Sequence, residues 1–560
     1  MLTLHPSTVD YVILAIYFVV VLGIGFVARL SIKTDLDFFL SGRSLPAWIT
    51  GLAFIAANLG ALEILGQAAN GAQYGIPAVH YYWLGAVPAM VFLGIVMMPF
   101  YYGAKVRSVP EYLRLRFNDA THAFNASTFA IATVLISGVN LFALALIIHL
   151  MLGWSIAVAI LVAAALVLVY ITLGGLTSAI YNEVLQFFII VAALLPLTLV
   201  ALHSIGGWGG LENKVRAFKK LGEPGLHAWH GLAIHHVTNP LASDWVGIVF
   251  GLGFVLSFGY WTTNFAEVQR ALSASNISAA RRTPLIGAFP KIFLPTIIIV
   301  PGIIAVLTVK GLGGTSQNLS YNTAIPHLIG NFLPQGMLGI AVTGMLAAFM
   351  AGVAANVTAF NTVVTYDLIQ AYFVKGRDPA YYLRAGRLVT VAGILVSVGT
   401  AFIASGYSNI MNYIQTLFSI FNAPLFATFI IAMFWKRATA WGGFFSLVAG
   451  TAAAYIVNRL NAYNTIFHFG SPLSASFWQA IIAFLADAVV MVAVSLVTKP
   501  KPVEELKGLV WGSANQGRRS RDRSTRQAVV ALPSPAQGRR PRPARRPQHH
   551  LRLGGPHVVS

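Results

Sequence analysis

The sequence predicts an all-α, polytopic membrane protein, and three observations support this fold class. Of the 560 residues, 57% are hydrophobic and only 10% are charged, whereas a soluble globular chain carries about 25% charged residues. Apolar runs of about twenty residues recur along the chain, and as α-helices each could cross about 30 Å of hydrocarbon. The basic residues outside these runs collect in alternate connecting segments, as expected for loops on one side of a membrane.

Thirteen candidate spans follow one another along the chain. They cover about residues 10–30, 46–68, 79–100, 123–150, 154–173, 181–204, 244–272, 284–309, 338–372, 385–404, 409–435, 439–458 and 474–497. The first apolar run, YVILAIYFVVVLGIGFVA from Tyr11, is longer than the apolar part of a typical signal peptide and lacks an evident cleavage site. We therefore expect it to remain as the first helix.

The distribution of Lys and Arg predicts the orientation of these spans. Basic residues occupy the loops within 33–43, 105–116, 281–282, 375–387 and 436–437. The alternate loops around 69–78, 151–153 and 405–408 carry none. The segment 205–243 is basic but long, and long loops follow the positive-inside rule poorly. We expect a multi-pass protein of the cell membrane with its N-terminus outside and its C-terminus in the cytoplasm.

The ten spans after the first divide into two groups of five. The span that opens each group, 46–68 or 244–272, is interrupted by small and polar residues. Interrupted helices at matching places in two halves are typical of inverted-repeat transporters. The expected organisation is a first helix and loop (1–45), a ten-helix transport core (46–435), additional membrane helices (436–500) and a basic tail (501–560).

Half of the net charge of +20 lies in that tail, where 13 Lys and Arg accompany only 3 Asp and Glu. After GLVWG (508–512) the tail is rich in Arg and Pro, a composition that cannot form a core. It is expected to be a disordered cytoplasmic extension; a lipid- or nucleic-acid-binding tail and a frame slip in the gene are the alternatives. Because the charge is local, we expect the core to bind no nucleic acid.

Enzymatic classes find no support. The chain has no cysteine and therefore no thiolate chemistry, and it lacks both the phosphate-binding GxxxxGK[ST] and the zinc-binding HEXXH motif. We expect a protein that is not an enzyme.

Ionisable residues inside spans are costly and therefore mark candidate functional sites. They are Glu63, Glu183, Glu267, Lys291, Asp367 and Asp487. Glu63 lies in AANLGALEILG (56–66), where unwinding near Asn58 would free carbonyl groups for a cation. A simple packing kink, with Glu63 hydrogen-bonded inside the bundle, is the alternative.

The other ionisable positions predict different roles. Lys291, flanked by prolines in FPKIFLP, requires a carboxylate partner or a polar solute unless it reaches an interface. Glu267 is expected to pair locally with Arg270. Asp367 is either an interfacial cap or a site residue, and Asp487, outside the core, is expected to be structural.

Several longer motifs make the chain recognisable. They are DFFLSGRSLPAW (37–48), IAAN (55–58), SVPEYLRLRF (108–117), GGLTSAIYNEVLQFF (174–188), QRALSAS (269–275), KIFLPTIIIVPG (291–302), TYDL (365–368) and YIQ (413–415). In this order, over about residues 10–500, they resemble the sodium/solute symporter family and within it the sodium/glucose–galactose branch. The resemblance implies a five-plus-five inverted-repeat core with flanking helices.

The resemblance also implies a sodium site between the first and eighth core helices. Its backbone carbonyl ligands fall on Ala56, Leu59 and Ala348. Two adjacent hydroxyl residues of the eighth core helix are replaced here by Ala351 and Gly352, which removes two expected ligands. The acidic residue of the family's GGL…TD…Q motif falls on Glu183, which we count with the cation site.

The solute site implied by the resemblance keeps some positions and changes others. Asn58, Lys291 and Gln415 match in type, and Tyr260 matches the aromatic residue that closes the sugar site toward the cytoplasm. A glutamine becomes Glu63, a glutamate Tyr82, a serine Gly85 and an asparagine Ser257. We expect Glu63 either to pair with Lys291 or to help hold the cation that Ala351 and Gly352 no longer bind.

The function predicted from this is secondary active symport, in which inward Na⁺ flow drives uptake of a sugar or sugar-like solute by alternating access. A symporter of another small organic solute (an amino acid, a carboxylate or a polyol) and an uncoupled carrier or sensor are the alternatives. The expected partners are the solute, Na⁺ as coupling ion and the lipid bilayer, with no further cofactor. The oligomeric state is not predicted.

Overall fold

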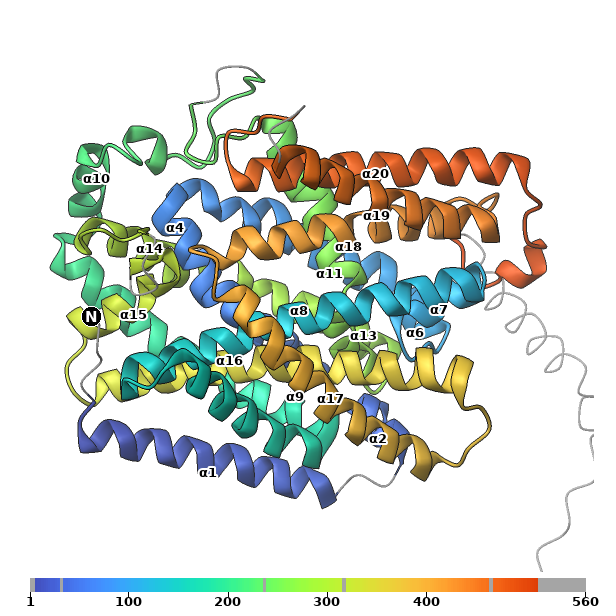
Figure 1. The fold of residues 1–560 in the computed structure, drawn as a ribbon, viewed down its shortest axis with the longest axis horizontal. Coiled ribbons are helices and arrows are strands. Elements are labelled where there is room, and N and C mark those ends of the chain that lie inside the picture. Colours follow the sequence, from blue (N-terminus) through green and yellow to red (C-terminus); the bar gives the residue numbers. More distant parts are fainter. Residues whose placement is uncertain (1–5, 31–33, 235–237, 315–318, 463–466, 512–560) are drawn as a thin grey trace, which may run out of the picture. The chain divides into compact units, whose positions relative to one another are not determined.

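A computed structural model describes residues 6–30, 34–234, 238–314, 319–462 and 467–511. These residues form helices joined mostly by short connections, with a long connection between α10 (Gly207–Ala217) and the helix that begins at Gly247 (Figure 1). Within the described part of the chain the only β-type pairing is an isolated bridge between Leu45 and Ala274. The predicted all-α fold class is therefore confirmed.

Ten helical segments in the described residues are long and apolar enough to cross a membrane, and two bent helix pairs raise this number to as many as twelve. The segments are Thr8–Ala28, Ile76–Gly103, Asp119–Leu152, Gly175–Ser204, Ile277–Thr308, Met337–Phe373, Pro379–Ala404, Ile410–Phe434, Ala440–Ala462 and Pro472–Val497. The span predicted at 154–173 corresponds to a shorter apolar stretch, Ile156–Val169. The predicted number of thirteen is thus not confirmed.

The short stretch belongs to α9 (Ile156–Ser204), which also contains the next predicted span. The two parts meet at Gly175, whose φ of +52° and ψ of −150° interrupt the helix. A Cβ at Gly175 would lie 2.6 Å from the Phe38 ring, so this position suits glycine in both conformation and space. The kink replaces the separate loop expected between these spans.

The two interrupted helices are present where the sequence predicts them. In the first, α3 (Ala47–Asn58) meets Leu62–Tyr74 at 55°; in the second, Gly247–Thr263 meets Phe265–Leu272 at 49°. At the second bend Asn264 leaves the helical conformation, and its side-chain oxygen caps the Ala266 N–H at 3.1 Å. Each bent pair opens one group of five, as in an inverted-repeat transporter.

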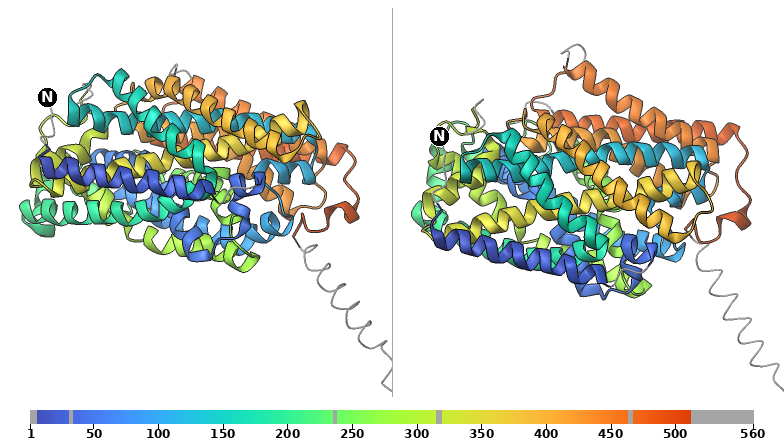
Figure 2. Two further views of the ribbon diagram at one scale, coloured as in Figure 1. Left: turned by 90° about the horizontal axis from the view of Figure 1, so that it is seen from below. Right: turned by 60° about the horizontal axis from the view of Figure 1, so that its bottom comes forward.

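The first bend lies deep in the bundle. Helices α8 (Asp119–Leu152) and α16 (Met337–Thr362) pack against each other, and α3 packs against α16. Helix α1 (Thr8–Leu30) lies along one edge, and α19 (Ala440–Ala462) and α20 (Pro472–Val497) lie along the opposite edge, in agreement between Figures 1 and 2. The bend is consequently enclosed by core helices.

The first residues of the segment expected to be a tail pack on the bundle. The Leu509 carbonyl accepts the Tyr112 hydroxyl at 2.6 Å, and the Trp511 N–H donates to the Met433 carbonyl at 2.7 Å. Residues 512–560 lie outside the described residues, so the disordered basic tail stays a prediction for that part of the chain. The membrane orientation and the domain boundaries also stay predictions.

Candidate functional site

The bend in the first core helix explains why small residues surround Glu63. The Leu59 N–H donates to the Ala56 carbonyl at 3.0 Å, a tightened turn, whereas the Gly60 carbonyl accepts from Glu63 at 3.1 Å and from Ile64 at 3.0 Å. A Cβ at Gly60 would lie 3.2 Å from the Gly352 Cα, so only glycine lets the bend approach α16 this closely.

Glu63 forms the buried ion pair that the sequence offered as one of two hypotheses. Its Oε1 accepts from the Lys291 ammonium at 2.5 Å, and its Oε2 accepts from the Tyr82 hydroxyl at 2.5 Å. The Lys291 and Glu63 side chains are 1% and 7% exposed. Both carboxylate oxygens therefore have charged or polar donors, which a buried charge requires.

The Lys291 ammonium is also held by neutral groups and does not reach an interface. It donates to the Asn58 side-chain oxygen at 2.5 Å. It lies 4.9 Å from the centre of the Tyr82 ring and 5.1 Å from that of Trp261, where ring faces attract a cation. Lys291 thus joins the first bent helix to α13 (Ile277–Lys291).

A chain of hydrogen bonds runs from Asn58 to the second bent helix. The Asn58 amide donates to the Tyr260 hydroxyl at 3.0 Å, and that hydroxyl donates to the Glu267 carboxylate at 2.6 Å. The expected local pair of Glu267 with Arg270 is wrong, because Arg270 pairs with Glu183. Tyr260 instead connects the two halves of the helix across the bend at Asn264.

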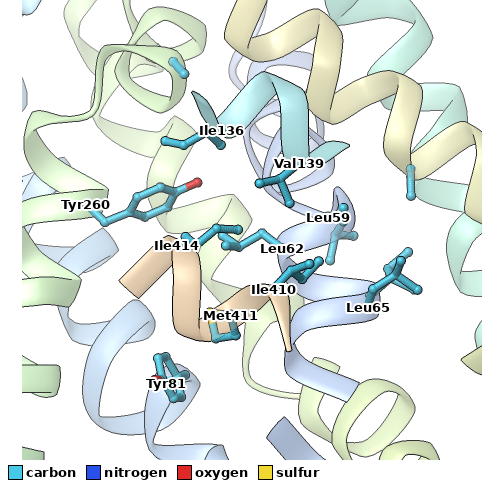
Figure 3. Close-up of a cluster of buried hydrophobic side chains, with 14 of the residues drawn as sticks. Leu59, Leu62, Leu65, Tyr81, Ile136, Val139, Tyr260, Ile410, Met411 and Ile414 are labelled. Atoms are coloured by element: carbon cyan, nitrogen blue, oxygen red, sulfur yellow. The ribbon is translucent and has the colours of Figure 1, made fainter. Parts of the chain in front are cut away.

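A cavity lies between the two bent helices and α18 (Ile410–Phe434). Its lining residues are Asn58, Leu62, Glu63, Gln67, Tyr81, Ala86, Leu252, Leu256, Ser257, Tyr260, Trp261, Met411, Gln415 and Phe418. Two of the predicted solute residues, Tyr82 and Lys291, do not line the cavity. They bind the carboxylate of Glu63, which does. Figure 3 shows Leu62, Ile414 and Tyr260 gathered beside the bend, on the apolar part of this region.

The cavity lining offers hydrogen-bonding groups that the protein itself leaves available. Within the described residues, the Gln415 Oε1 is buried without a partner, while its amide nitrogen lies 3.3 Å from the Met411 sulfur. Ser257 differs, because its hydroxyl is taken by the Leu252 carbonyl at 2.7 Å. Gln67 and Trp261 also line the cavity and were not predicted. The signal in the sequence was their position in the two interrupted spans.

The residues of the predicted cation site come from the first bend, α16 and α9. Ala56 and Leu59 lie at the first bend and Ala348 lies on α16, all fully buried. Glu183 lies on α9, where its Oε2 accepts from the Arg270 Nε at 3.2 Å and its Oε1 from the Arg270 Nη2. Because both oxygens are bound by one guanidinium, Glu183 is engaged as a structural partner.

The two remaining ionisable residues lie outside the cavity lining, and each has one carboxylate oxygen bound and one without a partner among the described residues. Asp367 is buried, and its Oδ1 lies 2.9 Å from the His122 Nε2. Asp487 accepts the Thr428 hydroxyl at 2.8 Å and is completely buried between α18 and α20. The second agrees with the structural role expected for it.

Comparisons with known proteins agree with this arrangement. The model of the sodium:solute symporter family matches residues 38–450. Sodium/glucose cotransporter 1 of Ovis aries is 30% identical, over 91% of this chain and 82% of the relative, and the sodium/glucose cotransporter of Vibrio parahaemolyticus is 26% identical, over 90% and 93%. A substrate-bound, outward-open Na⁺-coupled sialic acid symporter has the same fold, with a TM-score of 0.73 at 17% identity over 88% of this chain and 99% of that one.

Proposed function

The chain belongs to the sodium:solute symporter family, and from this premise we propose that it is a sodium-coupled symporter that imports a neutral sugar or sugar-like polyhydroxylated solute. Its relatives include sodium/glucose cotransporters of animals and of a bacterium. The bundle of apolar helices places the protein in a membrane.

One observation carries the choice of a neutral solute: the charged residue in the cavity lining, Glu63, is already paired with Lys291. Lys291, the single cation of the cluster, is bound by Glu63 at 2.5 Å. A carboxylate or amino-acid solute would need an unpaired charge inside the membrane, where an ion without a partner is expensive. The Gln415 Oε1, which has no partner among the described residues, and the Gln67 amide nitrogen instead offer an acceptor and a donor suited to hydroxyl groups.

The bends supply a route to alternating access. Tyr260 lies between the solute cavity and Glu267, so its hydrogen bonds couple the cavity to the second bent helix. Na⁺ at the first bend would favour the conformation open to the outside, and solute would favour closure around it. Each ligand shifts the equilibrium only by its differential affinity for the two states. In the cell membrane, with the N-terminus outside, this cycle moves solute inward.

Uptake into proteoliposomes tests the proposal. A panel of labelled hexoses, polyols, amino acids and monocarboxylates is offered with an inward Na⁺ gradient, with equal Na⁺ on both sides, or with choline in place of Na⁺. We expect accumulation of a sugar or polyol only with the gradient. Equilibration without accumulation would identify an uncoupled carrier, and accumulation of an amino acid or carboxylate alone would refute the neutral solute.

A further inference from the structure

A second cavity lies where α7 (Val109–Arg116), the start of α8 and the helical segment Val363–Phe373 meet. Its volume is about 210 Å³, below the roughly 300–1,000 Å³ of pockets for drug-sized ligands. Its lining residues are Arg107, Glu111, Arg114, His122, Tyr366, Asp367, Gln370, Ala371 and Lys375, and none of them lines the solute cavity. The space and its polar lining suit a small, charged ligand.

The buried part of this lining is a hydrogen-bonded pair, His122 and Asp367, which are 1% and 4% exposed. The Tyr372 hydroxyl donates its only proton to the Asp119 carbonyl at 2.8 Å, so the His122 Nδ1, 2.6 Å from the Tyr372 oxygen, must be the donor there. The proton that joins the pair then lies between the His122 Nε2 and the Asp367 Oδ1, which are 2.9 Å apart. The Asp367 Oδ2 has no partner among the described residues and is an acceptor whichever of these two atoms holds the proton.

The outer part of the lining carries three cations. Arg107 and Lys375 are exposed, and Arg114 uses its Nε for Asp119 at 2.6 Å, so that its two terminal nitrogens can turn to the cavity. The one carboxylate of the lining outside the buried pair is Glu111, whose Oε2 accepts the Arg107 backbone N–H. Positive charge therefore exceeds negative charge around a buried acceptor that needs a donor.

A hydrogen phosphate group meets both requirements. Guanidinium and ammonium groups bind phosphate oxygens, and a P–OH group donates its proton to an acceptor oxygen. We propose that this cavity binds hydrogen phosphate, as the free anion or as the headgroup of phosphatidic acid. Arg107, Arg114 and Lys375 bind the phosphate oxygens, and the Asp367 Oδ2 accepts from the P–OH.

The buried acceptor also gives the site a selectivity. Sulfate has the shape and the charge of hydrogen phosphate but carries no proton at neutral pH, so it would leave the Asp367 Oδ2 unpaired. The cavity should consequently prefer phosphate to sulfate, whereas a merely basic surface would bind both alike.

Equilibrium dialysis of radiolabelled orthophosphate against the purified full chain in dodecyl maltoside, in phosphate-free buffer, tests the proposal. Unlabelled phosphate, sulfate and short-chain phosphatidic acid are the competitors. We expect saturable binding, with phosphate competing at least about tenfold better than sulfate. Stronger competition by phosphatidic acid than by orthophosphate would assign the site to the lipid headgroup, and competition by orthophosphate alone would assign it to the free anion.

Two variants separate the charge from the recognition of the proton. Arg107→Gln, at an exposed position, should weaken phosphate and sulfate alike by about tenfold. Asp367→Asn should bind the two anions about equally, because its amide nitrogen can donate to sulfate. Arg282→Gln, at an exposed arginine outside the lining, is the matched control and should keep the wild-type affinity and selectivity.

Four results would each overturn the proposal: no saturable phosphate binding, equal affinities of the wild type for phosphate and sulfate, unchanged affinity in Arg107→Gln, or an equal loss in Arg282→Gln. Wild-type selectivity in Asp367→Asn would overturn the role of the Oδ2 acceptor. If that variant does not fold, the sulfate comparison in the wild type still tests the same role. Sodium-driven solute uptake bears only on the proposed function, because the two cavities share no lining residue.

Discussion

Glu63 and Lys291 are opposite charges that stabilise each other inside the bundle. Removing one partner leaves the other as an uncompensated buried charge, a loss of about 3–5 kcal/mol for a buried pair. We expect Glu63→Gln to lower the unfolding temperature markedly and to abolish concentrative uptake, because the Lys291 ammonium would then lie beside the cavity without a carboxylate partner. Thermal unfolding in detergent and uptake in proteoliposomes measure the two effects.

The double variant Glu63→Gln/Lys291→Met separates charge balance from recognition. Removing both charges should restore much of the unfolding temperature, since replacing a buried pair by uncharged groups is often neutral, whereas uptake should stay low. Glu504→Gln, at an exposed carboxylate, is the control and should change neither property. Wild-type uptake by Glu63→Gln would show that the pair plays no part in transport.

Tyr260 permits a test of the hydrogen-bond chain without a change of charge. Tyr260→Phe keeps the ring and removes the hydroxyl that joins Asn58 to Glu267, so two hydrogen bonds are lost. Loss of the bond that orients Asn58 toward the cavity, about 1 kcal/mol, should raise the KM for solute about fivefold. Initial-rate uptake over a range of solute concentrations measures this, with the half-exposed Tyr455→Phe as control. An unaltered KM would separate Tyr260 from solute binding.

Some of these site residues could be predicted from the sequence and others could not. Glu63 and Lys291 stand out because charges are rare in apolar spans, and each needed the other. The pairing of Arg270 with Glu183 was not predicted, because Glu267 lies only three positions from Arg270 in the sequence. The choice between the two carboxylates depends on tertiary structure, which brings Glu183 of α9 to Arg270 of α12 (Phe265–Leu272).

Among helices, the crossing of α4 (Ala68–Tyr74) and α14 (Leu294–Thr308) shows how glycine sets a packing distance. A Cβ at Gly302 would lie 3.0 Å from the Ala68 Cα, and one at Gly71 would lie 3.1 Å from the Ile299 Cα. The two backbones therefore touch directly, as at small-residue crossings of membrane helices. This crossing supports the half of the first core helix that follows the bend.

We expect Gly302→Ala to destabilise the protein by about 1–3 kcal/mol, the usual range for overpacking, with a corresponding fall in unfolding temperature. Gly23→Ala on α1 is the matched control, because nothing lies within 4 Å of the added methyl group. The control should be neutral or slightly stabilising, as alanine favours helix by about 1 kcal/mol. Equal unfolding temperatures for both variants would contradict the close crossing.

At the same scale, hydropathy located most helices but not all their breaks. The bends were predictable because polar and small residues interrupt otherwise apolar runs at 46–68 and 244–272. The continuation of α9 through Gly175 was not, since a glycine between two apolar runs equally suits a loop. Its course depends on Phe38, which occupies the space beside Gly175 and is distant in sequence.

For the whole molecule, composition and the recurrence of long apolar runs were enough to predict the class, and the two interrupted runs predicted the two-fold division of the core. An apolar chain in a bilayer has few ways to satisfy its backbone other than helices, so the fold class followed from hydropathy alone. The mutual packing of α8, α16 and α3 did not follow, because apolar faces of membrane helices carry little information about their partners.

Orientation is the property of the whole molecule that remains to be measured, and the absence of cysteine from the chain makes it accessible. Helix α10 (Gly207–Ala217) lies at the end of the bundle where α1 begins (Figure 1), so exposed Lys219 shortly after it should face outward with the N-terminus. We expect Lys219→Cys to react in intact cells with a membrane-impermeant maleimide. Exposed Lys436→Cys, in a basic loop, should react only after permeabilisation, because positive loops stay in the cytoplasm. The wild-type chain is the unlabelled control, and the reverse pattern would place the N-terminus in the cytoplasm and invert the direction of the proposed cycle.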